Sequence, residues 1–155
     1  MIEEKHVSLI VSKLLKENGF NEPCHYFYEN EKIFHDLDKY FPDGVRNSDF
    51  NSSYKGGTLL YTAPTYQIAL SWLMASNIHI GVYPCSKDYP VEGKTPEIVY
   101  QCTAINANEP FHLIKDDYLM DSINGVFNSE YFDTPEEALD NAIQYSLKNF
   151  FTKHD

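Results

Sequence analysis

The sequence predicts one α+β domain over residues 1–155, with three helices and a mainly antiparallel sheet in the order α-β-β-α-β-β-(β)-α. Three observations predict this class. Apolar residues recur at helical spacing near both ends, and they alternate with polar residues in the strongest strand pattern. The chain length fits one domain, and no internal repeat or composition break divides it. Two stretches rich in turn residues, 36–60 and 84–96, are predicted loops.

The first helix is predicted over residues 3–18. Apolar residues fall at positions 7, 10, 11, 14 and 15, which is the spacing of one helix face. Gly19 is placed to end this helix as a left-handed cap, and Phe20 is placed to fold back on the last turn.

The predicted strands cover residues 24–29, 31–36, 78–83 and 97–105, with one or two more within 110–132 around an Asn124-Gly125 turn. In 97–105 the alternation places Ile98, Tyr100, Cys102 and Ala104 on one face of the sheet.

The last helix has the clearest start signal. Thr134 is its predicted cap, Pro135 takes the first helical position, and Glu137 stands three residues after the cap. Its buried face is predicted to include Ala138, Leu139, Ala142, Ile143, Tyr145 and Phe150.

A run from Gly56 to Ser86 carries no Asp, Glu, Lys or Arg, although the chain has a net charge of −11. Its helical part, from near Thr62 or Pro64 to Ser76, is shorter than the ~20 residues that cross a bilayer. The run is therefore core or contact surface. We expect its middle to form the packing centre of the domain, with these residues buried: Leu70, Leu73, Met74, Ile78, Ile80 and Val82.

This second helix is apolar on two sides, and a helix of that kind is usually covered on two sides. Trp72, with Ile68 and Tyr61, forms the candidate contact surface. Three covers are open: the loop 36–60, a second copy of the chain in a homodimer, or another protein. Aromatic residues and an absence of charge are typical of interface cores.

The charge balance argues against direct nucleic-acid or membrane binding. The chain has 23 acidic and 12 basic residues, and Arg46 is its single arginine, whereas phosphate binding needs clustered cations. Solubility is the simpler reading of the acidity; an acidic decoy that mimics DNA for a host protein is the alternative. A decoy needs rows of carboxylates, and we expect scatter among these residues: Asp116, Asp117, Asp121, Glu130, Asp133, Glu136, Glu137 and Asp140.

No sequence pattern indicates a catalytic, cofactor-binding or metal-binding residue. Cys24 and His25 are neighbours on a predicted strand and point to opposite faces, so they cannot pair. Cys24 and Cys102 are expected to be small buried hydrophobes. The six histidines are spread over the chain without metal-ligand spacing, and the acidic pairs Asp36/Asp38 and Asp116/Asp117 read as solvated turns. The alternative is a small enzyme with a Cys- or Asp-centred site, for which Cys85 is a further candidate.

The N-terminal segment has acidic residues at Glu3 and Glu4 and no small-residue cleavage site, so it does not read as a signal peptide. An odd number of widely spaced cysteines agrees with reduced thiols. The sequence therefore predicts a cytoplasmic protein.

Three stretches carry a resemblance: KLLKENGFNEPC at 13–24, YTAPTYQIALSWL at 61–73 and YFDTPEEALDNAI at 131–143. Together they resemble a group of small uncharacterised proteins of phages and prophages of gut Bacteroidetes. The resemblance covers most of the chain except the two loops, and its motifs are structural. It implies an accessory protein of a mobile element and no known activity. The resulting hypothesis is a non-catalytic protein that acts by protein–protein contact, with itself as a homodimer or with another protein.

Overall fold

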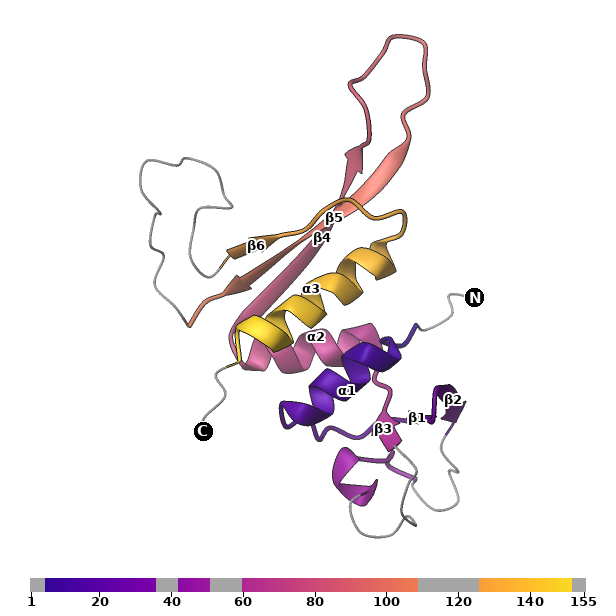
Figure 1. Ribbon diagram of the computed structural model, residues 1–155, viewed down its shortest axis with the longest axis vertical. Helices are drawn as coiled ribbons and strands as arrows, with labels where there is room; N and C mark the ends of the chain where they lie inside the picture. The colour runs from indigo at the N-terminus through magenta and orange to yellow at the C-terminus, as the bar shows by residue number, and fades with distance from the viewer. Residues whose placement is uncertain (1–4, 36–41, 51–59, 109–125, 152–155) are drawn as a thin grey trace. The chain divides into compact units, whose positions relative to one another are not determined.

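A computed structural model describes residues 5–35, 42–50, 60–108 and 126–151 and has an α+β fold with antiparallel sheets (Figure 1). The fold class is as the sequence predicts. The chain divides into two compact units, unit 1 (Met1–Trp72) and unit 2 (Leu73–Asp155), and each is described by itself. The expectation of a single domain stays a prediction.

Unit 1 contains a three-stranded sheet in the order β2-β1-β3. Its elements are α1 (Leu9–Glu17), β1 (Tyr26–Glu29), β2 (Lys32–His35), the 3-10 helix η1 (Asn47–Phe50), β3 (Leu60–Thr62) and the first turns of α2 (Tyr66–Ala75).

Helix α1 begins later than the sequence pattern predicts, at Leu9. The reason is Ser8, whose hydroxyl accepts a hydrogen bond from the Val11 amide and so caps the helix. The end is as predicted. Gly19 has φ +91°, and the amide of Phe20 donates to the Leu15 carbonyl at 2.9 Å. These are the bonds of a Schellman cap, which fold the buried Phe20 back against the last turn.

The central strand β1 makes contacts on both faces of the sheet of unit 1. On one face, Phe27 packs against a buried cluster of Val45, Phe50 and Leu60. On the other, the hydroxyl of Tyr28 donates to the Val7 carbonyl at 2.7 Å, just before α1. The N-terminal segment and η1 therefore hold the sheet from opposite sides.

Strand β3 begins at the last residue of the predicted loop 36–60 and extends to Thr62, and α2 starts at Tyr66 rather than at Thr62 or Pro64. Thr62 is drawn into the sheet instead. It pairs with Phe27, and its amide donates to the side chain of buried Asn47 at 2.9 Å. A three-residue strand of this kind depends on partners far away in sequence, so local pattern does not reveal it.

Unit 2 contains a second three-stranded sheet, in the order β4-β5-β6. Its elements are the end of α2, β4 (Ile78–Ser86), β5 (Ile98–Asn106), β6 (Val126–Asn128) and α3 (Pro135–Asn149). The predicted loop 84–96 starts too early, because β4 continues through Pro84 to Ser86. Since β4 is an edge strand, it tolerates the missing N–H of a proline. The predicted Asn124-Gly125 turn lies outside the described residues.

Helix α3 packs on β4 and β5 (Figure 1). The contact joins four fully buried small residues, Cys102 and Ala104 of β5 with Ala138 and Ala142 of α3. The predicted cap is present, since the Thr134 hydroxyl accepts from the Glu137 amide at 3.2 Å. Of the four residues predicted to share one face of β5, Cys102, Ala104 and Tyr100 pack in this core, whereas Ile98 at the outer end is 45% exposed.

The predicted packing centre is correct in part. Leu73 and Ile78 are buried, and Leu70, Ile80 and Val82 are half-buried. Met74 is 58% exposed, so its predicted burial is wrong. Met74 lies in the last turn of α2, which ends at Ala75. Among the described residues, no helix is long and apolar enough to span a membrane.

Candidate functional site

The three residues of the predicted contact surface are all half-buried, but each has different surroundings. The ring of Tyr61 lies below two lysines of α1. Ile68 lines a small hollow. Trp72 meets the buried ring of Phe20 edge to face, with centroids 5.5 Å apart. The described contacts do not join them into one surface, and their role in binding stays a prediction.

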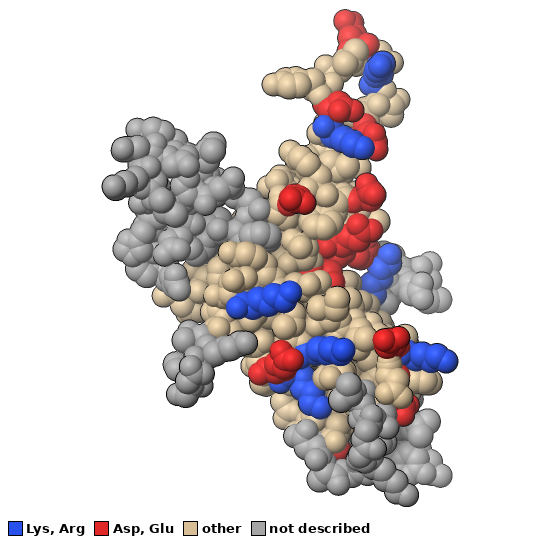
Figure 2. All heavy atoms as spheres, in the orientation of Figure 1, with Lys and Arg blue, Asp and Glu red and all other residues tan. Residues whose placement is uncertain are grey.

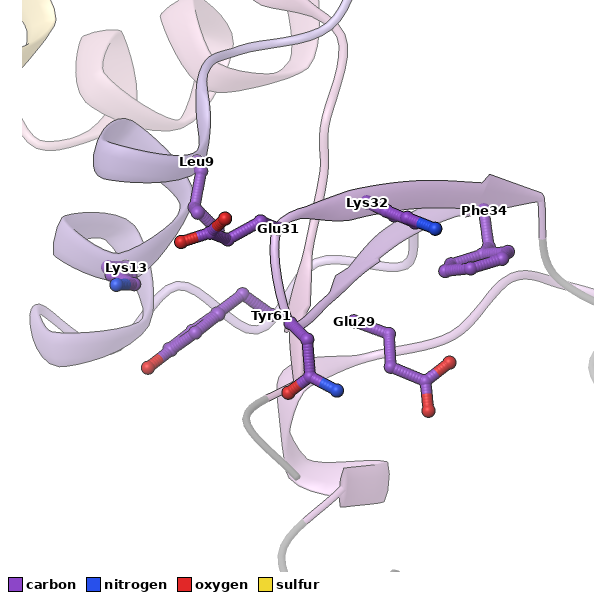
Figure 3. Close-up of a pocket in the computed structure, with 8 residues that line it drawn as sticks. Leu9, Lys13, Glu29, Glu31, Lys32, Phe34 and Tyr61 are labelled. Atoms are coloured by element: carbon purple, nitrogen blue, oxygen red, sulfur yellow. The ribbon is translucent and has the colours of Figure 1, made fainter. Parts of the chain in front are cut away.

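One hollow of unit 1, which we call the turn groove, has a volume of about 570 Å³ (Figure 3). It lies between the side chains of α1, the turn that joins β1 to β2, and Tyr61 of β3. Its lining combines apolar surface with both signs of charge: Leu9, Lys13, Glu29, Asn30, Glu31, Lys32, Phe34 and Tyr61. A volume of this order suits a small ligand or a few residues of a peptide.

The turn at the groove has an uncommon backbone. Both of its central residues have positive φ, +57° at Asn30 and +134° at Glu31. Asparagine tolerates this region, whereas glutamate rarely adopts it. Strained residues persist where the surrounding structure holds them, often at sites of function. The turn therefore marks the groove as a candidate site by an observation independent of its volume.

Tyr61 links the groove to α1 by contacts with cations. The ammonium groups of Lys16 and Lys13 lie 5.3 Å and 5.8 Å from its ring centroid. The Lys16 ammonium also donates to the Leu60 carbonyl at 3.1 Å. These contacts place two ammonium groups beside the Tyr61 ring. An aromatic ring next to positive charge suits a ligand that carries both an apolar part and an anionic group.

Sequence analysis identified Tyr61 and missed the rest of the groove. The dipeptide Asn30-Glu31 does not by itself predict a hairpin turn, because the favoured two-residue turns contain Gly at one of their two central positions. Leu9 and Lys13 read as ordinary helix residues. The groove depends on α1 lying beside β3, a contact between segments about fifty residues apart that no local pattern encodes.

A smaller hollow of unit 1, about 280 Å³, holds a cysteine and histidines: its lining includes Cys24, His6, His25, Tyr26 and Ile68. Burial raises the pKa of the Cys24 thiol from 9.0 to about 11, and the nearby Glu22 carboxylate adds to the rise. The thiol is therefore protonated at neutral pH. It donates to the Glu22 carbonyl at 3.5 Å, so it has the properties of a buried hydrophobe rather than of a nucleophile.

Burial also raises the pKa of the Cys102 thiol, which is fully buried under α3. Both cysteines are thus buried, as predicted. Within the described ranges, no group of three or more His, Cys, Asp or Glu side chains is arranged to hold a metal ion. The acidic residues Asp36, Asp38, Asp116 and Asp117 lie outside those ranges.

Unit 2 presents a different feature, a hairpin arm formed by β4, β5 and the connecting residues 87–97 (Figure 1). The two strands pair from Ile78↔Asn106 to Ser86↔Ile98. Strand β6 pairs with β5 at residues 103–105, and the segment after it continues along β5 to Tyr100, whose backbone exchanges two hydrogen bonds with Phe132. Among the described residues of unit 2, only the part of the hairpin beyond Pro84 and Tyr100 is therefore a two-stranded arm, and it extends past α3.

The end of the arm is exposed and apolar at its centre. Tyr89 is 94% exposed and Val91 56% exposed, with Pro90 between them. Around them lie two lysines and three carboxylates, and Figure 2 shows both signs of charge at this end of the arm. The charged residues are Lys87, Asp88, Glu92, Lys94 and Glu97.

Several bonds give the arm a defined shape. The Lys87 amide donates to the Glu97 carbonyl at 2.9 Å, and their side chains form an exposed ion pair at 3.5 Å. Gly93, at φ +84°, closes a turn in which the Lys94 amide donates to the Val91 carbonyl. The exposed aromatic residue is thus carried on a hydrogen-bonded hairpin.

The carboxylates relevant to the decoy alternative are only partly within the described residues. Five of them, from Glu130 to Asp140, lie before and within the first turns of α3, where Figure 2 shows acidic side chains gathered. The other three, Asp116, Asp117 and Asp121, lie outside the described ranges. The decoy therefore remains an untested alternative.

No protein-family model, curated protein or solved structure matches this chain.

Proposed function

We propose that this chain is a binding protein that acts by protein–protein contact, and that the end of the β4–β5 arm is its contact surface. The observation that carries the proposal is Tyr89, which is 94% exposed at the end of a hydrogen-bonded hairpin. Tyrosine is enriched among the residues that dominate binding energy at interfaces. A large aromatic ring held in solvent is otherwise an unfavourable arrangement.

The composition of the arm supports a protein as the partner. Tyr89, Pro90 and Val91 form an apolar centre, and charged side chains of both signs surround them. An apolar core with a polar rim is the usual anatomy of a protein interface. The partner that fits is a protein with an apolar pocket for the tyrosine ring and charges of both signs at the pocket edge. The resemblance to phage and prophage proteins supports the role of an accessory protein of a mobile element.

The experiment has two steps and a matched control. A photo-crosslinking amino acid in place of Tyr89 captures the partner in the native host, and the partner is then purified. Its affinity is measured for the wild type, Tyr89→Ala and Tyr131→Ala. Tyr131 is also exposed, at 60%, but it belongs to the segment between β6 and α3 and not to residues 87–97 of the arm.

We expect Tyr89→Ala to weaken binding about thirtyfold or more, the loss that corresponds to ~2 kcal/mol at a hot spot. Tyr131→Ala should change the affinity less than about twofold. Equal affinities of the two variants for the purified partner would refute the arm as the contact surface. A partner that crosslinks equally well from position 131 would refute it too.

A further inference from the structure

The turn groove carries charges of both signs that have no ionic partner among the described residues. The ammonium groups of Lys13 and Lys16 lie beside the Tyr61 ring, and neither lysine forms an ion pair with a described carboxylate. Glu29 and Glu31, which also line the groove, form no ion pair with a described lysine. In a chain with 23 acidic residues, two lysines without a carboxylate partner are available to the anion of a ligand.

Three of these charged side chains are half-buried: Lys13, Lys16 and Glu29. A half-buried charge has lost part of its hydration, so an opposite charge stabilises it more than it would stabilise a fully exposed one. Lys32 pairs with Glu29 across the β1–β2 hairpin, but it is exposed and forms no ion pair in the described part of the chain. It therefore reduces the negative charge of the two glutamates without cancelling it.

Figure 3 shows how the charges are distributed around the groove. Lys13 and Tyr61 lie on the α1 side, and Glu29 and Phe34 lie on the hairpin side, with Glu31 between them. The backbone of Glu31 has φ +134°, which a glutamate rarely adopts. Each side of the groove thus combines a charged group with an aromatic ring. This arrangement matches a ligand of two linked residues, in which each residue has one charged end and one apolar side chain.

We propose that the turn groove binds a short peptide with free ends and apolar side chains, of which a dipeptide is the simplest case. The carboxylate of its last residue lies beside the ammonium groups of Lys13 and Lys16, and the side chain of that residue packs on Tyr61. The ammonium group of its first residue lies between Glu29 and Glu31. The volume of about 570 Å³ is within the range of small-ligand pockets. This site is independent of the arm in unit 2.

The two glutamates disfavour a ligand that carries only negative charge. A phosphate monoester carries about −1.5 to −2 at neutral pH, and the carboxylates of Glu29 and Glu31 would repel it. A peptide with free ends has one negative and one positive end, so it can present an opposite charge to each side of the groove. The charge pattern therefore selects a zwitterion over a simple anion.

The test is isothermal titration calorimetry of the full chain with the dipeptide phenylalanyl-leucine. We expect the wild type to bind it with a Kd on the order of 0.1 mM, an ordinary value for a ligand of this size. Two blocked forms of the same dipeptide each lack one charge: the N-acetyl form has no ammonium group, and the C-terminal amide has no carboxylate. Each blocked form should bind about tenfold more weakly, the ratio for one charge-assisted hydrogen bond.

Substitutions in the protein assign each end of the peptide to its side of the groove. Lys13→Gln should weaken binding of the free dipeptide about tenfold and change the affinity for the amide form less than about twofold, because that form has no carboxylate to lose. Glu29→Gln should act in the same way on the free dipeptide and the N-acetyl form. Lys148→Gln and Glu17→Gln, which remove exposed charges outside the groove, are the matched controls and should leave the affinity unchanged.

Circular dichroism establishes that each variant is folded, and nuclear magnetic resonance gives a second readout. On titration with the dipeptide, the amide signals of Asn30 and Glu31 should shift, whereas those of residues 87–97 in the arm should not. No binding of the dipeptide at about 10 mM overturns the proposal. So does equally tight binding of free phenylalanine or of either blocked form, or an affinity for the free dipeptide that neither Lys13→Gln nor Glu29→Gln changes.

Discussion

In unit 1 the sheet packs large aromatic side chains, whereas in unit 2 it packs small ones. Phe27 and Phe50 meet in one core cluster, and the rings of Phe20 and Trp72 meet edge to face. Under α3, the contact is made by alanines and Cys102. Aromatic packing fills space with side chains, while alanine packing lets a helix backbone approach a sheet closely. The two units should therefore respond to opposite kinds of substitution, unit 1 to lost volume and unit 2 to added volume.

The largest effect is expected in the aromatic region of unit 1. Phe20 is 1% exposed and contacts Trp72, so Phe20→Ala leaves a cavity and should lower the free energy of unfolding by about 4 kcal/mol. Urea denaturation followed by circular dichroism measures the change. Tyr89→Ala, which removes an exposed ring, is the control and should cost less than ~0.5 kcal/mol. Equal costs would contradict the packing described for unit 1.

Asn47 is expected to give the next largest effect. Its amide nitrogen donates to the Phe20 carbonyl and its oxygen accepts from the Thr62 amide, each at 2.9 Å. Asn47→Ala leaves both backbone groups buried without these partners and should cost about 3 kcal/mol. Asn149→Ala removes an exposed bond within α3 and should cost far less. A small loss of stability in Asn47→Ala would mean that water reaches the two backbone groups.

A larger side chain in the core should lower the stability of unit 2. Ala142→Leu places a larger side chain against β5 and should cost about 2 kcal/mol by overpacking. Ala75→Leu, at the exposed end of α2, is the control. Trp72, the single tryptophan, lies in unit 1 and reports on it by fluorescence. If Ala142→Leu shifts the circular dichroism transition and leaves the fluorescence transition unchanged, the units unfold separately, and the single-domain prediction is wrong.

The smallest effect is expected at the cap of α3. Thr134→Ala removes the acceptor for the Glu137 amide and should cost about 1 kcal/mol. Thr134→Ser keeps the hydroxyl and should retain most of the stability. Thermal denaturation of the two variants separates the capping bond from other effects of the threonine. A serine variant as unstable as the alanine variant would assign the effect to the lost methyl group.

The features that sequence analysis predicted correctly are those encoded by neighbouring residues. The capping box at Thr134, the glycine stop at Gly19 and the alternation around Cys102 each need only a few adjacent residues. Strand β3 was missed because its three residues are defined by pairing with β1 and by a bond to Asn47. The candidate surfaces were missed for the same reason, except for Tyr61. The turn groove needs a positive φ at Glu31, and the arm needs a strand that continues through Pro84.

The arm also determines where the chain can be opened. Lys94 lies in an exposed turn at its end, between two strands that remain paired for nine residues each. A protease that cleaves after lysine should cut there before it reaches the paired strands, because exposed turns are the preferred sites of nicking. The two fragments would stay associated through the hairpin and α3 and separate only on denaturation. The same position should tolerate an inserted tag or new chain ends without loss of the fold of unit 2.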